Sequence, residues 1–294
     1  MSLNVYHLEI FFHVAKHGSV SQAAESMGRE QPTISALIGD LEKSLGDVRL
    51  FHRRPFRLTD PGNELFEAIR SFFTDLPKIE EKIRGGDIIR IGASPIILRD
   101  HLPPIEKHLR QKFPRLRLFL REGNEPQLLR DVERDDIDIA ITLKPEQAPP
   151  KVRVDLLDLE LAPVLLVPKT HKAKTADEIL QADDLDPLIA LPPDELLMRL
   201  FAERLKQSDI IWRPSVEVTS LDLIQHFVLQ GYGVGLSVHR PDSALPSGLR
   251  ELLLQDFPKL ELALLYRDHG TMPLFNSFVA ETKKHVARLK QKKG

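Results

Sequence analysis

Apolar residues near the start of the chain recur at helical spacing and predict three short helices. The first covers residues 6–17 and stops at Gly18, a residue typical of a helix C-terminus. Ser19 and Gln22 have the spacing of a capping box, which begins a second, short helix. The third helix covers residues 31–45. Its inward stripe consists of Ile34, Leu37, Ile38, Leu41 and Leu45.

The opposite face of the third helix is small and polar, so it is suited to contact a partner rather than a core. This face and its flanks carry Pro32, Thr33, Ser35, Ala36, Gly39 and Lys43. Two helices joined by a short turn after a supporting helix form the helix-turn-helix plan, whose second helix enters the DNA major groove. Residues 1–60 are therefore expected to form a DNA-binding domain.

A basic run follows between Asp47 and Asp60, with no acidic residue inside it. The run contains Arg49, His52, Arg53, Arg54 and Arg57. We interpret it as a β-wing, two short extended pieces around an Arg53-Arg54-Pro55 turn. Such a cluster alone is usually a solvated face, but beside a helix-turn-helix it is expected to bind phosphates or reach the minor groove.

A longer helix is expected to begin at Asp60-Pro61 and to serve as a linker over residues 61–86. Its sustained apolar seam consists of Leu65, Phe66, Ile69, Phe72, Phe73, Leu76, Ile79 and Ile83. A seam this apolar on a small domain indicates pairing with a second copy of the chain. Pro77 interrupts the seam, so a kink or a break is expected there.

The remaining residues alternate between strand and helix patterns and predict parallel sheet covered by helices. Strands are expected at 88–93, 116–120, 137–141, 161–167, 187–190, 215–218, 234–237 and 260–266. Helices are expected at 105–112, 127–134, 176–181, 195–207, 221–230 and 273–290. Two similar halves predict a first lobe of residues 87–162 with 266–294 and a second lobe of residues 163–265, with a cleft between them.

Composition narrows the classes of function. The chain holds 41 Lys and Arg against 43 Asp and Glu, so any nucleic-acid contact must come from a local patch. The absence of cysteine excludes disulfides and thiol chemistry and fits a cytoplasmic protein. The first residues lack the pattern of a secretory signal, and no apolar run is long enough to span a membrane.

Several motifs keep a spacing that resembles the LysR-type transcriptional regulators. They are residues 11–24, Gln31-Pro32-Thr33-Ile34-Ser35, Leu41-Glu42, Leu45-Gly46, Arg49-Leu50-Phe51 and Arg57-Leu58-Thr59, followed by looser matches at 88–92, 113–114, 136–140 and 231–235. The resemblance implies an α+β multidomain protein with a winged helix-turn-helix, a linker helix and a two-lobed effector domain like a periplasmic binding protein. It also implies a homodimer that assembles into a tetramer, with double-stranded promoter DNA, a small-molecule effector and RNA polymerase as candidate partners.

Two positions depart from the family pattern. Ala36 stands where the family often has Arg or Lys, so one groove or phosphate contact is expected to be missing. Glu30 stands where the family usually has Ser, which weakens the expected helix cap.

The DNA-binding residues are expected at the starts of the second and third helices and in the wing. They are Ser21, Gln22, Gln31, Pro32, Thr33, Ser35, Ala36, Arg53, Arg54 and Arg57. Gln31 has the amide to pair with adenine, Thr33 and Ser35 offer hydroxyl groups, and Ala36 fits a thymine methyl group. The alternative for Ser35 is a hydrogen bond within its own helix.

Polar residues at strand ends predict the effector site, because ligands of two-lobed α/β domains bind where strand ends meet the crevice. By the resemblance, effector contacts fall at Ser94, Asn124, Thr142, Pro193 and Thr219. Ser94 is expected to open a helix, whose free amides favour an anion, so the predicted effector is a small anionic metabolite. For each of these residues the alternative is a helix cap or a turn without a ligand.

Two other classes of protein were weighed. An enzyme is disfavoured because nucleophile-elbow, Walker and dinucleotide motifs are absent, so no catalytic residue and no cofactor are expected. His13 and His17 have metal-compatible spacing, but no third ligand is near in sequence and no metal is expected. The open alternative is a solute-binding or enzymatic α/β domain fused to a DNA-binding head.

Overall fold

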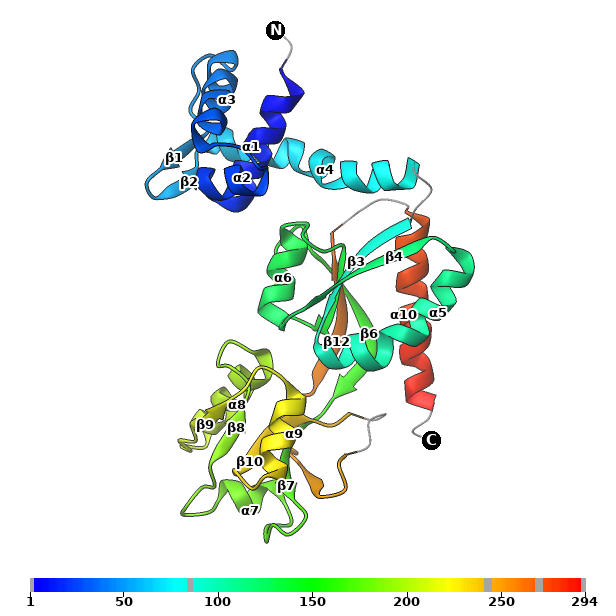
Figure 1. Cartoon of the computed structure of the whole chain (residues 1–294). Helices are drawn as coiled ribbons and strands as arrows, with labels where there is room; N and C mark the ends of the chain where they lie inside the picture. Colours follow the sequence, from blue (N-terminus) through cyan, green and yellow to red (C-terminus); the bar gives the residue numbers. More distant parts are fainter. Residues whose placement is uncertain (1–2, 84–86, 241–244, 268–271, 292–294) are drawn as a thin grey trace. The chain divides into compact units, whose positions relative to one another are not determined.

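The computed structural model describes residues 3–83, 87–240, 245–267 and 272–291 (Figure 1). The chain divides into two compact units, residues 1–86 and 87–294. Residues 84–86 of the predicted linker and the side chain of Arg53 lie outside the described part of the chain.

The first unit begins with the three predicted helices, α1 (Val5–His17), α2 (Val20–Ser26) and α3 (Gln31–Ser44). Ser19 Oγ accepts a hydrogen bond from the Gln22 amide at 3.3 Å, so half of the expected capping box is present. Glu30 precedes α3 without a side-chain cap, as its identity predicts. The core of this unit consists of Ile10, Phe11, Val14, Ala23, Ala24, Ile34, Ile38, Leu41, Leu50 and Phe51.

The wing consists of β1 (Phe51–Arg53) and β2 (Phe56–Leu58), which pair antiparallel and confirm the predicted hairpin. Thr59 fastens the base of this hairpin to the next helix. Its Oγ1 donates to the Arg49 carbonyl at 2.7 Å and accepts from the Gly62 amide at 3.1 Å. A Cβ at Gly62 would lie 1.9 Å from the Leu50 carbonyl oxygen, so this corner requires glycine.

The helix α4 (Asp60–Ile83) runs without interruption through Pro77, so the predicted break is wrong. Proline removes one backbone donor, so α4 continues through Pro77 without the hydrogen bond to the carbonyl of Phe73, four residues earlier. Part of the predicted seam is uncovered. Phe72 is 52% exposed and Ile83 is 80% exposed, which leaves an apolar face on the C-terminal half of α4.

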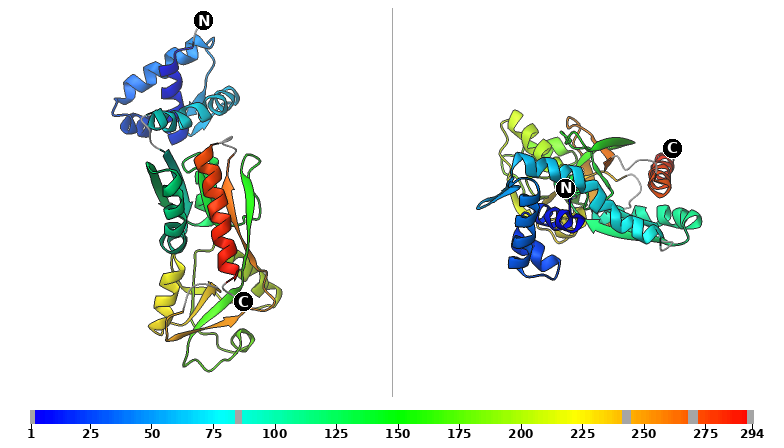
Figure 2. Two further views of the ribbon diagram at one scale, coloured as in Figure 1. Left: turned by 90° about the vertical axis from the view of Figure 1, so that its right-hand side faces the viewer. Right: turned by 90° about the horizontal axis from the view of Figure 1, so that it is seen from above.

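The second unit contains two lobes, and the first has a five-stranded sheet in the order β4-β3-β5-β12-β6. Its strands are β3 (Asp87–Ala93), β4 (Leu116–Glu122), β5 (Ile139–Leu143), β6 (Arg153–Leu161) and β12 (Leu260–Tyr266). Its helices are η1 (Ile97–His101, a π-helix), α5 (Leu102–Lys112), α6 (Glu125–Glu133) and α10 (Pro273–Gln291). α5 and α10 pack against each other, while α6 packs against β5 and β12 (Figure 2).

The second lobe has a sheet in the order β11-β7-β10-β8-β9. Its strands are β7 (Pro163–Pro168), β8 (Leu188–Ala190), β9 (Pro214–Glu217), β10 (Val234–Val238) and β11 (Leu249–Leu253). Its helices are α7 (Ala176–Leu180), α8 (Leu196–Gln207) and α9 (Leu221–Leu229). α9 packs so closely on β10 that a Cβ at Gly235 would lie 2.4 Å from Ile224 Cγ2.

The sequence prediction is wrong at three places in this unit. The strand expected at 161–167 is present as β7, but the sheets are mixed and not parallel, because β7 pairs antiparallel with β10 and β11, and β12 pairs antiparallel with β5 and β6. β6 and β11 were not predicted. β12 lies in the sheet of the first lobe, so that lobe resumes at Leu260 and not at residue 266.

We expect the substitution Gly62→Ala to lower the free energy of unfolding by about 2 kcal/mol, because the added methyl group meets backbone that cannot rotate away. The matched control is Gly39→Ala, a position on α3 where a Cβ meets nothing within 4 Å. This control should be neutral or raise the free energy of unfolding by up to ~1 kcal/mol. Thermal unfolding followed by circular dichroism measures both, and equal shifts in the two variants would contradict the close contact.

Candidate nucleic-acid interface and interlobe cavity

α3 presents a polar face because its apolar side chains are buried in the head. Ile34, Ile38 and Leu41 are at most 2% exposed, which fixes the rotation of the helix about its axis. On the other side, the residues predicted to contact DNA lie at the surface in the N-terminal half of the helix. Gln31, Pro32, Thr33 and Ala36 are exposed, and Ser35 is half-buried.

The starts of α2 and α3 are joined by a hydrogen bond between two of the predicted DNA-binding residues. Ser21 Oγ donates to Gln31 Oε1 at 3.2 Å. Gln22, also predicted, is exposed beside Ser21. The contact holds the Gln31 amide in place and leaves its NH₂ group available to an acceptor such as a base nitrogen or a phosphate.

Side chains alternate between the two faces of the wing strands, so the aromatic ones turn inward and the basic His52 and Arg57 lie at the surface. Phe51 and Phe56 turn inward, with ring centroids 5.1 Å apart, while His52 and Arg57 lie opposite each other on the two strands. Arg54 and Arg57 are exposed, and neither forms an ion pair with another described residue. Their charge is therefore available to an anion such as a phosphate group.

A cavity of about 580 Å³ lies between the two lobes of the second unit. Ser94, Asn124, Thr142 and Thr219, four of the five residues predicted to contact an effector, line it. Pro193 is exposed and does not line the cavity, whereas Pro192 and Glu195 from the same turn do. The volume is within the usual range for small-molecule sites.

The residues predicted to contact an effector differ in the hydrogen bonds that they form and in their burial. Asn124 is the N-cap of α6, since its Oδ1 accepts from the Gln127 amide at 3.0 Å, and the capping alternative holds for it. Ser94 follows β3 at the start of a helical segment, where its carbonyl accepts from the Leu98 amide at 3.1 Å. Thr142 is 7% exposed. Among the described residues, the hydroxyl groups of Ser94 and Thr142 have no hydrogen-bond partner.

Two buried glutamates in the cavity wall were not predicted. Glu125, from the first turn of α6, is 5% exposed, and Glu195, just before α8, is 8% exposed. Burial raises the pKa of Glu125, and burial with the nearby Asp194 carboxylate raises the pKa of Glu195 to about 7. Arg199 is the nearest cation, with its Nη2 3.0 Å from Glu146 and 3.8 Å from Glu125 Oε2.

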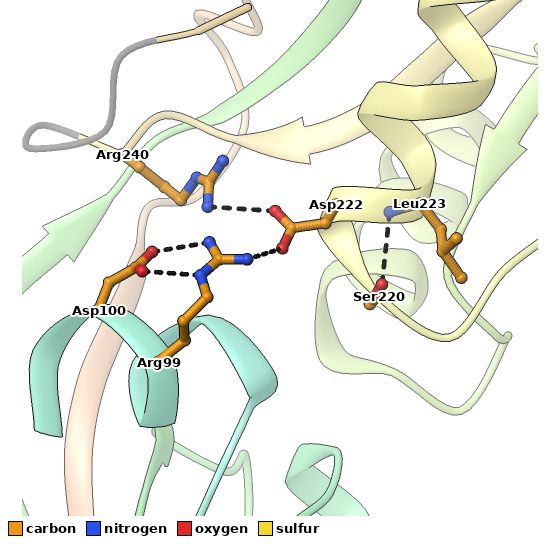
Figure 3. Close-up of polar contacts among 6 residues, drawn as sticks. All are labelled: Arg99, Asp100, Ser220, Asp222, Leu223 and Arg240. Atoms are coloured by element: carbon orange, nitrogen blue, oxygen red, sulfur yellow. Dashed lines mark hydrogen bonds and ion pairs between the residues drawn. The ribbon is translucent and has the colours of Figure 1, made fainter.

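A second group of charges crosses from lobe to lobe at Arg99 of η1 (Figure 3). Arg99 Nη1 lies 2.7 Å from Asp222 of α9, and its Nε lies 2.7 Å from Asp100. The Arg99 guanidinium lowers the pKa of Asp100. Arg240, which lines the cavity, lies 3.7 Å from the other oxygen of Asp222. These contacts tie the two lobes together in the observed arrangement.

Within the described residues, no helix combines the length and apolar character needed to cross a membrane. The same residues contain no cluster of three or more His, Asp or Glu side chains arranged for a metal ion.

Two sequence profiles match the chain. One, described as the LysR substrate binding domain, matches residues 85–287, and the other, a bacterial regulatory helix-turn-helix protein of the lysR family, matches residues 5–63. A hydrogen peroxide-inducible genes activator of Dickeya chrysanthemi is 26% identical over 276 residues, which is 90% of this chain and 90% of that protein.

Solved structures share the fold. A full-length OxyR variant from Pseudomonas aeruginosa superposes with a TM-score of 0.63 at 21% identity, covering 97% of this chain and 95% of that one. Full-length CbnR in complex with its target DNA superposes with a TM-score of 0.59 at 16% identity, covering 96% and 99% of the two chains.

The raised pKa of Glu195 predicts a pH-dependent stability. The folded state holds this proton more tightly than the unfolded state, so the free energy of unfolding should fall as the pH rises from 4.5 to about 7. Glu195→Gln removes that fall and should make the chain more stable at pH 8 by about 2 kcal/mol. Urea unfolding followed by the fluorescence of Trp212, the single tryptophan, measures the change.

The control for this measurement is Glu203→Gln, an exposed position on α8, the helix that Glu195 precedes, which should leave the pH profile unchanged. A profile of Glu195→Gln that coincides with that of the unsubstituted chain would show that the Glu195 carboxyl is not perturbed by its surroundings.

Proposed function

Because the chain belongs to the LysR-type family of transcriptional regulators, we propose that α3 and the wing bind promoter DNA under the control of a small anionic metabolite held between the lobes. Membership makes the chain a DNA-binding regulator with an effector-binding domain. The observation that carries the DNA part of the proposal is the rotation of α3, which turns Gln31, Thr33 and Ala36 outward.

In this proposal α3 reads bases and its surroundings hold the sugar-phosphate backbone. Gln31 pairs with adenine, the hydroxyl groups of Thr33 and Ser35 contact bases or phosphates, and Ala36 meets a thymine methyl group. Pro32, exposed in the first turn of α3, contacts the DNA beside them. Phosphate contacts come from Ser21, Gln22 and the wing arginines Arg53, Arg54 and Arg57, which also have the length to enter the minor groove.

We propose that the active form is a homodimer joined along α4. The uncovered side chains of Phe72, Ile79 and Ile83 support this, since an apolar face on an exposed helix is stabilised by a second copy. We also propose that two dimers associate into a tetramer and that the regulator contacts RNA polymerase. Promoter DNA places such a regulator in the bacterial cytoplasm.

The anionic effector is supported by the groups that line one part of the cavity. Ser94 lies at a helix start, Ser220 caps α9, and Arg240 adds a guanidinium. A thiol-based response to peroxide is not open to this chain, because it contains no cysteine. The second candidate, an enzymatic or solute-binding domain fused to the head, would be favoured if the full chain turned over its ligand.

We expect Arg54→Ala and Arg57→Ala each to weaken binding to all DNA sequences by a similar factor and to reduce the slope of log affinity against log salt by about 1. Fluorescence anisotropy with the upstream region of the chain's own gene, at several salt concentrations, measures both quantities. The control is Arg213→Ala, an exposed arginine of the second lobe. Unchanged slopes in both wing variants would remove the wing from the interface.

We expect Ser94→Ala to weaken effector binding about 3- to 10-fold, because one hydrogen bond to the anionic group is lost. Isothermal titration calorimetry of the full chain against a panel of small carboxylates measures this, with Ser215→Ala on the exposed strand β9 as the control. A carboxylate that binds both variants equally well would place the anionic group away from Ser94.

A further inference from the structure

The lining of the interlobe cavity contains two glutamates, Glu125 and Glu195, here called the acidic wall, and an arginine, Arg240, here called the basic wall. Glu125 of the first lobe and Glu195 of the second line the same cavity, and both are more than nine-tenths buried. They lie close enough for the Glu125 charge to raise the pKa of Glu195, while Asn124 hydrogen-bonds to the Glu195 carboxylate. A simple anion would be repelled by this wall, so a purely anionic ligand does not account for it.

The carboxylates in and around the acidic wall outnumber the positively charged side chains that contact them. Arg199 faces Glu125, Glu146, Asp194 and Glu195, and its best contacts go to Glu146 and to the Asp194 carbonyl. Arg130 is a second cation whose charge acts on Glu125 and lowers its pKa. Two guanidinium groups therefore serve four carboxylates, and the two inside the cavity wall receive the weakest contacts.

Each wall also holds a buried polar atom that has no hydrogen-bond partner among the described residues. On the acidic side this atom is Glu125 Oε2, and on the basic side it is Arg240 Nη1. An unsatisfied buried charge costs free energy unless a partner arrives. Each atom has only a long ion-pair contact, Glu125 Oε2 at 3.8 Å from Arg199 and Arg240 Nη1 at 3.7 Å from Asp222. Each can therefore still form a hydrogen bond with a ligand, one as acceptor and the other as donor.

Much of the remaining cavity lining is apolar. It includes Ile141, Leu143, Leu161 and Leu262, which come from strands and their ends. A ligand with charged groups of both signs and a hydrocarbon body matches this arrangement of donor, apolar wall and acceptor.

We propose that the effector is amphoteric: a small amino carboxylate whose ammonium group is bound by Glu125 and Glu195 while its carboxylate faces Arg240 and Ser94. The proposal rests on the proposed function and specifies the chemistry of its ligand. An ammonium group has three N–H donors, enough to reach carboxylates on both lobes at once. Its binding therefore links Glu125 and Glu195 and favours the closed arrangement of the lobes.

The experiment uses the full chain and calorimetric titration with the proteinogenic L-amino acids, together with the carboxylate that lacks the amine and the amine that lacks the carboxylate for each. At least one amino acid should bind, and both of its single-function analogues should bind more weakly by about 10-fold or more. If no amino acid binds, or if the carboxylate without the amine binds as tightly, the proposal is wrong.

The variants locate the ammonium group. Glu125→Gln and Glu195→Gln should each weaken binding of that amino acid about 10- to 100-fold and leave binding of its carboxylate analogue equal or tighter, because a repelling charge is removed. Glu203→Gln should change neither. The stability of Glu195→Gln at pH 8 shows whether this variant is folded. Glu-dependent binding of Mg²⁺ or Ca²⁺ alone, with no response to the amino acids, would overturn the proposal in favour of a metal ion.

Proton release gives an independent readout. Asp194, Glu125, Arg199 and the Asn124 amide face Glu195, whose pKa is raised to about 7. An ammonium group should displace the proton, so titrations at pH 7 in buffers of different ionisation enthalpy should show proton release that Glu195→Gln abolishes. Binding of a carboxylate that depends on Ser94 but not on either glutamate would refute the ammonium site and leave the proposed regulator intact.

Discussion

Burial of three side chains on α3 determines which side of that helix is exposed at the surface. Ile34, Ile38 and Leu41 are held among α1, α2 and the base of the wing, so the helix cannot rotate to hide its polar side. Gln31 and its neighbours are exposed as a consequence, and Ser21 orients the Gln31 amide across the turn. The wing adds exposed positive charge on the same unit. Under the proposed function that charge attracts any duplex, and the α3 side chains distinguish sequences.

In the second unit, packing likewise determines which groups are available to a small ligand. The chain passes between the sheets at Ala162 and again before Leu260, so the strand and helix ends of both lobes meet at one cavity. Ion pairs such as Arg99–Asp222 join the lobes outside the apolar lining. Glu125 and Arg240 in the cavity wall each keep a buried polar atom without a hydrogen-bond partner among the described residues. Under the proposed function, a ligand that matches these charges and that of Glu195 stabilises one arrangement of the lobes over others.

Local signals were enough to predict the head and most elements of the lobes. The stripe on α3, Gly18 and the basic run between Asp47 and Asp60 act over a few residues, and the helices and wing follow from them. In β6, Leu157, Leu159 and Leu161 alternate with the exposed Asp158 and Glu160, which is a local strand signal. β12 belongs to the first lobe because it pairs with β5. The two strands are far apart in sequence, so no local pattern predicts this pairing.

The residues that line the cavity also fall into those that the local sequence predicts and those that it does not. Ser94 and Thr142 end strands, which is a local property, whereas Glu125 and Glu195 have the sequence of ordinary exposed helix starts. Their burial exists only once both lobes are packed, so the acidic wall could not be found from sequence alone.

The most informative measurement is protection of guanine N7, a major-groove atom, from dimethyl sulfate when the full chain saturates a duplex taken from upstream of its own gene. If α3 lies in the major groove of a dimer's two half-sites, guanines should be protected in two groups about one helical turn, or a multiple of it, apart. Saturated DNA with every guanine N7 still reactive would show that α3 does not enter the groove.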